Sequence, residues 1–213
     1  MLGALGTLLV LAPIALVPSC TPPEGQPYSA PLPVPFTVSD YFSPTGYMGD
    51  GATIGVVNMV AAVCPSRPAN AQGDCYTVTY TPPVPRAQGF AGVYWQYPGN
   101  NWGGYEGHQV SAGATKLTLQ AMGSRGGEPV SFKAGGIATT DNTVEHHDTL
   151  DASGPTEMLT TQWAQYEVDF NGQGYGDEVL GAFAWLLSLP EPTGTAADKE
   201  PIVFYLDDIR WTQ

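Results

Sequence analysis

Basic residues are scarce in this chain, which has 7 Lys and Arg against 20 Asp and Glu and a formal net charge of −13. A protein that binds nucleic acid needs basic side chains to neutralise phosphate groups, so this charge excludes nucleic acid as a partner. Charged residues of both signs amount to only 13% of the sequence, whereas Gly (26) and Pro (20) are abundant. Few charges together with many turn-forming residues are typical of a protein built from strands and turns.

The sequence motifs of several enzyme classes are missing as well. The chain has no Gly-x-Ser-x-Gly elbow, no phosphate-binding glycine loop and no catalytic cysteine pattern. Glycoside hydrolysis needs two carboxylates about 5–10 Å apart, and four are available outside any recognisable motif, namely Glu106, Asp148, Glu157 and Glu167. We therefore expect a protein that is not an enzyme, and keep a small polysaccharide hydrolase or lyase as an alternative.

One polar cluster, Glu145-His146-His147-Asp148, offers ligands for a transition metal, with His108 as a further candidate. Adjacent histidines on an extended chain point in opposite directions, so both rarely bind one ion. The His-x-His spacing of a cupin metal site is absent. These features favour a solvated loop over a metal site.

The chain contains only three cysteines, Cys20, Cys64 and Cys75. Cys64 and Cys75 flank a short loop rich in Pro, Asn and Gly, and in an exported protein such a pair forms a disulfide. A zinc site would need more ligands at closer spacing. We therefore predict a Cys64–Cys75 disulfide.

The N-terminal segment predicts export. Residues 2–17 form an apolar run of the length found in signal peptides, too short for a typical spanning helix. The following Val17-Pro18-Ser19-Cys20 resembles the lipobox of bacterial lipoproteins, in which the cysteine is lipidated, although Pro18 is unusual there and no Lys or Arg precedes the run. An ordinary secretory signal or a retained anchor helix are the alternatives. We expect residues 1–20 to be a signal and lipobox segment, with a lipid on Cys20 anchoring the protein to the membrane at the bacterial cell envelope or surface.

A proline-rich segment separates this signal from the predicted domain. Residues 21–35 contain six prolines within fifteen positions and predict an extended tether. The folded domain is expected to span residues 36–213. Within it, short alternating or apolar segments predict strands at residues 36–42, 54–63, 76–80, 92–97, 115–122, 129–134, 163–170, 179–189 and 202–209. A short helix is the alternative at residues 54–63. Glycine-rich residues 44–51 and polar residues 141–154 predict loops, and no convincing amphipathic helix is present. This pattern predicts an all-β, antiparallel β-sandwich of jelly-roll type.

The second half of the domain resembles a known superfamily. Its succession is an alternating strand at 115–122, Gly-Gly-Glu at 126–128, Val-Ser-Phe-Lys at 130–133, Leu-Thr-Thr-Gln-Trp-Ala-Gln-Tyr at 159–166 and Phe-Tyr-Leu-Asp-Asp-Ile at 204–209. These segments resemble the galactose-binding-like jelly-roll superfamily, which includes many non-catalytic carbohydrate-binding modules. The resemblance implies a β-sandwich whose ligand is a polysaccharide or another glycan.

The resemblance also implies a structural calcium ion that ties the last strand to the first, away from the sugar. Alternation places Asp207 and Asp208 on opposite faces of the last strand, with Asp208 on the face of Phe204. A carboxylate on an apolar face is costly unless it is paired or bound to a metal. We expect Ca²⁺ near Asp208 or Asp207, with further oxygen ligands from Asp40 or Asp50. The alternative is that Asp208 caps backbone amides or pairs with a basic residue.

The densest group of aromatic and amide side chains lies at residues 92–104, where an alternating strand runs into a polar turn. An aromatic ring stacks on the apolar face of a sugar, and amides provide hydrogen bonds to its hydroxyls. The candidate carbohydrate-binding residues are therefore Tyr94, Trp95, Gln96, Tyr97, Asn100, Asn101 and Trp102. Because neighbours on a strand face opposite sides, Tyr94 and Trp95 cannot both face the ligand. We expect Trp95 in the core and a platform of Tyr94 and Trp102; a structural or protein-interaction module of the same fold is the alternative.

Overall fold

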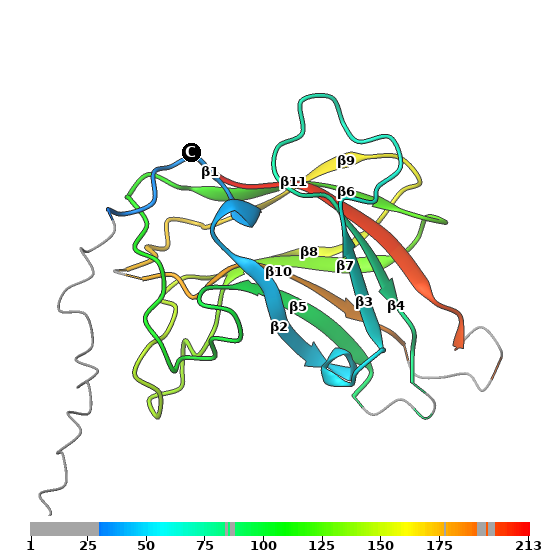
Figure 1. Cartoon of the computed structure of the whole chain (residues 1–213), viewed down its shortest axis with the longest axis horizontal. Coiled ribbons are helices and arrows are strands. Elements are labelled where there is room, and N and C mark those ends of the chain that lie inside the picture. Colours follow the sequence, from blue (N-terminus) through cyan, green and yellow to red (C-terminus); the bar gives the residue numbers. More distant parts are fainter. Residues whose placement is uncertain (1–29, 84, 86–87, 177, 191–194, 196–198) are drawn as a thin grey trace, which may run out of the picture. The chain divides into compact units, whose positions relative to one another are not determined.

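Two antiparallel β-sheets pack face to face in the computed structural model, which describes residues 30–83, 85, 88–176, 178–190, 195 and 199–213 (Figure 1). The six-stranded sheet has the order β3 (Val57–Ala61), β4 (Tyr76–Tyr80), β11 (Ile202–Thr212), β6 (Lys116–Gly123) and β9 (Ala164–Asp169), with β1 (Phe36–Thr37) paired to β11. The five-stranded sheet has the order β2 (Ser43–Gly49), β5 (Phe90–Gln96), β10 (Gly181–Ser188), β7 (Pro129–Gly135) and β8 (Asp151–Met158). Two 3-10 turns, η1 (Val38–Asp40) and η2 (Asp50–Ala52), flank β2. The predicted antiparallel β-sandwich is confirmed.

The core lies between the sheets and is rich in large aromatic rings. On β6 every second residue is buried, so Leu117 and its alternating neighbours face inward. Trp95, Trp185 and Trp211 are each 0% exposed. Trp95 packs on Phe183 of the neighbouring strand, with 4.8 Å between ring centroids. The indole N–H of Trp211 donates to the carbonyl of Ala182 at 2.8 Å and so ties the two sheets together.

Most predicted strands are confirmed, and the differences lie where glycine and proline are frequent. Residues 44–51, predicted as a loop, contain most of β2, and the polar segment predicted as a loop ends in β8, which begins at Asp151. The predicted strand at 36–42 is only two residues long, because the chain turns into η1 at Val38. Both unpredicted strands are sheet edges, where proline is tolerated because one side of the strand donates no ladder hydrogen bonds.

The packed unit begins earlier than predicted, at Pro31. Leu32 is buried and forms main-chain hydrogen bonds to Gln109 (2.8 Å) and from Ser111 (2.9 Å). The last part of the predicted tether therefore belongs to the domain. The predicted signal segment, Cys20 and residues 21–29 lie outside the described residues. No helix within the described ranges is long and apolar enough to cross a membrane.

Candidate functional site

Strand β5 sends alternate side chains to opposite faces of the five-stranded sheet, as predicted. Val93 and Trp95 belong to the core between the sheets. Tyr94 points to the outer face, where it joins a separate apolar cluster. Burial raises the pKa of Tyr94, and its hydroxyl donates to the carbonyl of Gly135 at 3.1 Å. Tyr94 is therefore a fixed, neutral part of this outer face.

Trp102 stands on this outer cluster and remains open to solvent. Its side chain is 45% exposed, and its ring meets that of Tyr94 edge to face, with centroids 6.0 Å apart and planes at 90°. We call the following residues the Trp102 platform: Trp102, Tyr94, Ile137, Leu180, Ala184 and the partly buried Met48, Ala138 and Leu186. Tyr94 is only 5% exposed, so Trp102 is the aromatic ring that the platform presents to solvent.

The loop that carries Trp102 is held by a buried amide. The Asn101 amide nitrogen donates to the carbonyls of Tyr97 (3.0 Å) and Tyr105 (2.7 Å), and its oxygen accepts from the N–H groups of Gly103 and Tyr105 at 3.1 Å each. Gln96 donates from its side chain to the Asn101 carbonyl at 2.8 Å. Asn101 and Gln96 are each 1% exposed. The structure therefore places both amides as internal braces of the loop, although the sequence had suggested them as sugar ligands.

Two other predicted residues remain at the surface. Asn100 is exposed and its N–H donates to the Thr45 hydroxyl at 2.9 Å, while its side-chain amide has no partner among the described residues. Tyr97 is 40% exposed and stacks on His108, with ring centroids 3.5 Å apart and planes at 18°. Burial lowers the pKa of His108, so the stacked imidazole is the neutral form at pH 7. Tyr97 and Asn100 thus keep exposed polar groups in the segment that leads to Trp102.

A second loop supports the first from the side. The N–H of His146 donates to the Gly103 carbonyl at 3.2 Å, and Val144 lies so close to Gly103 that a β-carbon there would be 2.7 Å from its methyl group. His146 pairs through Nδ1 with Glu178 at 3.1 Å, and Glu178 also accepts from the N–H of Gly107 at 2.9 Å. The cluster predicted at residues 145–148 therefore braces the Trp102 loop.

Asp148 is the buried anchor of this region. Its carboxylate accepts from the N–H groups of Leu180 (2.7 Å) and Ile137 (2.9 Å) and lies close to that of Gly181. Burial raises the pKa of Asp148 to about 7, against the opposing effect of these hydrogen bonds. The side chain joins the end of β7 to the start of β10, directly beneath the platform.

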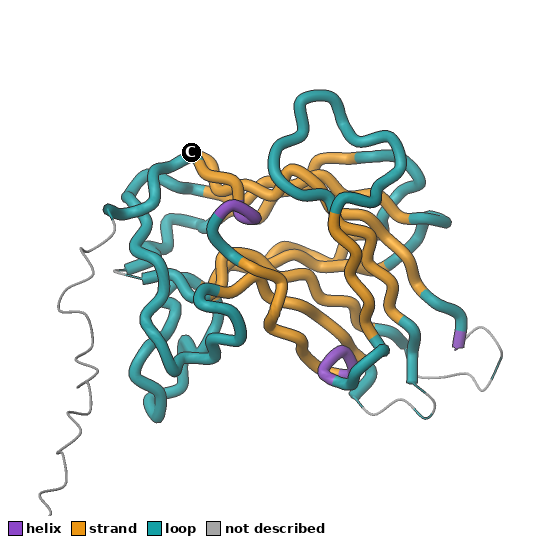
Figure 2. The backbone as a smooth tube through the Cα atoms, in the orientation of Figure 1, coloured by secondary structure: helices purple, strands orange, loops and turns teal. Residues whose placement is uncertain are grey.

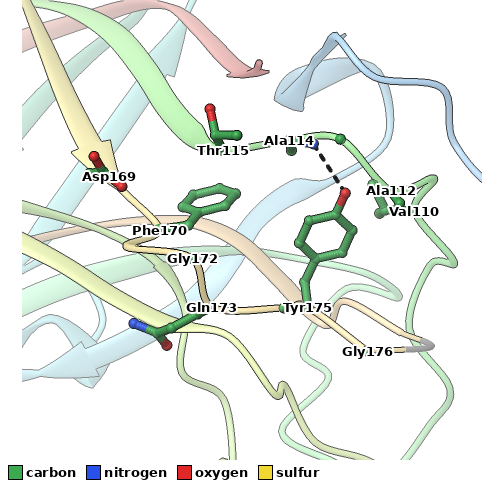
Figure 3. A pocket seen from close by; sticks show the side chains of 12 residues that line it. Val110, Ala112, Ala114, Thr115, Asp169, Phe170, Gly172, Gln173, Tyr175 and Gly176 are labelled. Atoms are coloured by element: carbon green, nitrogen blue, oxygen red, sulfur yellow. Dashed lines mark hydrogen bonds between the residues drawn. The ribbon is translucent and has the colours of Figure 1, made fainter.

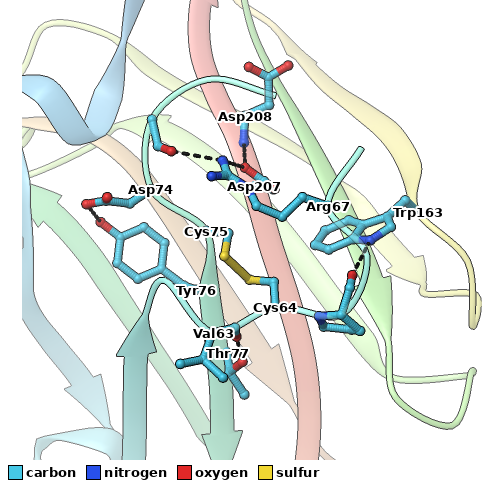
Figure 4. Close-up of a disulfide and its surroundings, with 12 residues drawn as sticks. Val63, Cys64, Arg67, Asp74, Cys75, Tyr76, Thr77, Trp163, Asp207 and Asp208 are labelled. Atoms are coloured by element: carbon cyan, nitrogen blue, oxygen red, sulfur yellow. Dashed lines mark hydrogen bonds and ion pairs between the residues drawn. A yellow bond between two sulfur atoms is a disulfide. The ribbon is translucent and has the colours of Figure 1, made fainter. Parts of the chain in front are cut away.

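The four carboxylates predicted to bind calcium do not form one site. Asp207 is fully buried and receives two hydrogen bonds from Arg67, from Nε at 2.7 Å and Nη2 at 2.6 Å (Figure 4). Asp50 accepts from the N–H groups of Gln88 (2.8 Å) and Gly89 (3.2 Å) and from the Tyr80 hydroxyl. Asp40 is exposed. The described residues include no group of three or more His, Cys, Asp or Glu side chains placed to hold a metal. These residues do not fit a shared calcium site, and calcium remains a prediction.

A bulge explains why Asp207, and not Asp208, is the buried carboxylate. The pairing of β11 with β6 shifts between Asp207 and Arg210, and Asp208 adopts a positive φ of 49°. The strand's simple alternation is broken there, so Asp208 does not share the buried face of Phe204 as predicted. Its carboxylate instead accepts from the N–H of Gln72 at 3.0 Å, which matches the alternative that it caps a backbone amide.

The predicted Cys64–Cys75 disulfide is confirmed, with the two Cα atoms 6.2 Å apart. The loop that it closes folds against β11, where Arg67 reaches Asp207 (Figure 4). The indole of Trp163 donates to the Pro65 carbonyl at 3.0 Å and holds the other part of the loop. The disulfide loop therefore covers part of the outer face of the six-stranded sheet.

A separate pocket of about 420 Å³ lies at the end of the sandwich, between residues 110–115 and 169–176 (Figure 3). Phe170 and Tyr175 form its apolar side, but they are only 1% and 8% exposed. The Tyr175 hydroxyl accepts from the N–H of Ala114 at 3.2 Å and donates to the Ser111 carbonyl at 2.6 Å. Because both rings are covered, the pocket presents no aromatic face to a ligand, and the Trp102 platform is the better candidate site.

The connections from β5 to β6, from β7 to β8 and from β9 to β10 lie together at one end of the two sheets, whereas the disulfide loop between β3 and β4 lies apart from them (Figure 2). Tyr105, in the same loop as Trp102, is 67% exposed and was not among the predicted residues, because it lies just beyond the aromatic segment at 92–104. Met48 and Leu186 were missed because they come from other strands. A tyrosine in a Gly- and Asn-rich loop was the one signal that could have identified Tyr105.

Comparisons with known proteins support the fold. No protein-family model matches the chain, and no curated protein matches its sequence. Among solved structures, the family 30 carbohydrate-binding module of a cellulosomal cellulase of Clostridium thermocellum is 13% identical, with a TM-score of 0.51 over 84% of this chain and 98% of its own. Another family 30 carbohydrate-binding module is 13% identical, with a TM-score of 0.50 over 84% and 99% of the two chains. At this identity the likeness shows a shared β-sandwich fold and nothing finer.

Proposed function

We propose that the chain is a non-catalytic carbohydrate-binding module that holds a neutral polysaccharide on the Trp102 platform. The observation that carries this proposal is the 45% exposed indole of Trp102, fixed by Tyr94 and by the Asn101 brace at the outer face of a sheet. A large aromatic side chain left in water contributes little to folding, whereas it is the preferred anchor of a binding surface.

The surroundings of Trp102 suit a sugar ring. The apolar C–H face of a pyranose stacks on the indole, and the partly buried Met48 and Leu186 extend the apolar surface. The same segment of the chain carries exposed polar groups for the sugar hydroxyls, namely the amide of Asn100 and the hydroxyls of Tyr97 and Tyr105. A small number of polar groups around an apolar surface is typical of ligand sites.

The charge of the sheet favours a neutral ligand. Lys133 is the one basic residue in the strands of the five-stranded sheet, all of which are described, and it is paired with Asp151. His146 is likewise engaged by Glu178. With a net charge of −13, the chain repels uronate and sulfated polymers over distances of about a Debye length.

We also propose that the protein is exported and anchored to the membrane through a lipid on Cys20. The apolar run at 2–17 and the lipobox-like residues before Cys20 support this location. The Cys64–Cys75 disulfide adds independent support, because disulfides persist in oxidising compartments outside the cytoplasm. Mass spectrometry of the protein from membranes tests the anchor: a diacylglyceryl group on Cys20 supports it, and an unmodified Cys20 contradicts it.

The binding proposal is tested with a panel of neutral and acidic polysaccharides in native affinity gels. We expect retardation by one or more neutral polymers, such as a β-glucan, xylan or mannan, and no retardation by polygalacturonate. Release of reducing ends from the same polymers tests the hydrolase alternative, and release of unsaturated products tests a lyase. No retardation by any polymer contradicts carbohydrate binding and favours the protein-interaction alternative.

A further inference from the structure

The strands at the sheet edges differ in how they are protected from pairing with another chain. The outer strands of the two sheets are β3, β9, β2 and β8. Proline and charged residues on an edge strand prevent unwanted pairing. Strand β2 contains Pro44, β8 contains Pro155 and Glu157, and β9 contains Glu167. Strand β3, Val-Asn-Met-Val-Ala, has neither a proline nor a charge.

The lack of charge extends well beyond β3. Residues 51–63 contain no Asp, Glu, Lys or Arg, in a chain whose net charge is −13. Three apolar side chains of this segment are exposed, namely Ile54 (101%), Val60 (40%) and Val63 (59%). An exposed apolar edge of this kind marks a surface that pairs with another strand.

The edge of β3 that faces away from β4 presents main-chain donors and acceptors in regular order. The Val56 carbonyl accepts from Thr81, and the N–H of Ala62 donates to Cys75, both at 2.8 Å. The main-chain N–H and C=O groups of the even-numbered residues of β3 therefore form hydrogen bonds with β4. The same groups of Val57, Met59 and Ala61 point away from β4. Within the described residues β3 pairs with β4 alone, which makes it an edge strand of the six-stranded sheet.

We propose that a second copy of this chain pairs with β3 edge to edge, antiparallel, about a two-fold axis at Met59. Val57 of each copy then lies opposite Ala61 of the other, and the outward groups form about six main-chain hydrogen bonds. The two six-stranded sheets become one continuous sheet. The occupant is a second copy because an uncharged edge lets two strongly acidic chains meet without facing like charges. The short strand makes this a weak, concentration-dependent dimer.

The proposed register gives a cross-linking test. On the outer face, Asn58 of one copy lies opposite Val60 of the other, with Cα atoms about 4.5 Å apart, within reach of a disulfide. In the full chain carrying Cys20→Ser, a mixture of Asn58→Cys and Val60→Cys proteins should form a covalent dimer faster than either protein alone. Peptide mapping should find the 58–60 link. Equal cross-linking in all three samples overturns the register and the proposal.

Sedimentation equilibrium of the full chain tests the dimer without new cysteines. The apparent molecular mass of the wild type should rise from 22.5 kDa toward twice that value as the protein concentration increases. Val60→Lys should abolish this rise in mass, because each copy would then carry a positive charge on the paired edge and the two charges would repel each other. The matched control, Thr156→Lys on the exposed edge strand β8, adds the same charge and should leave the rise unchanged. A monomer at every concentration, or a dimer that Val60→Lys does not weaken, overturns the proposal; neither result bears on carbohydrate binding.

Discussion

Replacing Arg67 with methionine should destabilise the domain more than replacing its partner Asp207 with asparagine. The Asp207 side chain is 0% exposed, and the two hydrogen bonds from Arg67, at 2.7 and 2.6 Å, supply its counter-charge. Arg67→Met leaves a buried carboxylate with the N–H of Asp208 as its remaining donor among the described residues, which costs about 3–5 kcal/mol. Asp207→Asn leaves Arg67, which is 40% exposed and still donates to Gly73, so the loss is about 1–2 kcal/mol.

Urea denaturation followed by tryptophan fluorescence, with the disulfide oxidised, measures both losses. The double variant should lose less than the sum of the single variants, because each single change removes the same pair. Equal losses for the two single variants, or a loss below about 1 kcal/mol for Arg67→Met, would mean that Asp207 is solvated and that the disulfide loop does not shield it.

Four smaller tests address other parts of the molecule. Reducing the Cys64–Cys75 disulfide should lower the free energy of unfolding by about 2–3 kcal/mol, measured by urea denaturation with and without reductant; no change would show that the loop is held by its other contacts. Leu32→Ala should destabilise the domain by about 2–4 kcal/mol in the same assay, because the residue is buried. No effect would indicate that Leu32 belongs to the tether and not to the folded domain. Burial raises the pKa of Asp148 from 3.8 to about 7, so its stabilising contribution is complete below about pH 4 and is lost as the pH rises through 7. The stability difference between wild type and Asp148→Asn should therefore shrink over that range, and a difference that grows with pH would contradict this. EDTA tests the calcium ion that the sequence predicts: a fall in the melting temperature that added Ca²⁺ reverses would support it, and an unchanged melting temperature would contradict it.

The strand pattern was predictable because alternation is a local property. Strand β4 coincides with the predicted segment at 76–80, and the inward position of Trp95 followed from its neighbours alone. The disulfide was predictable because two cysteines flank one short loop. The bulge at Asp208 was not, since an inserted residue that shifts the register leaves no periodic signal in the sequence.

The exposure of single residues in the candidate site was predictable in part, whereas the contacts of its amides were not. Trp102 was identified correctly as an exposed ring, whereas Gln96 and Asn101 proved to be braces of the loop. An amide in a loop can bind the chain's own backbone or a ligand, and the sequence does not distinguish these uses. Met48 and Leu186 reach the platform from strands far apart in the sequence, so only the sheet topology brings them together.

The most direct test of carbohydrate binding is the affinity of wild type, Trp102→Phe and Trp102→Ala for a neutral polysaccharide that retards the wild type, measured by isothermal titration calorimetry. Loss of the stacking ring should weaken binding of Trp102→Ala by about 1–3 kcal/mol, roughly 5- to 150-fold, while Trp102→Phe keeps most of the affinity. The melting temperature should change little, because Trp102 is 45% exposed and its one ring contact, with Tyr94, is edge to face. Wild-type affinity in a folded Trp102→Ala protein would contradict the proposed site.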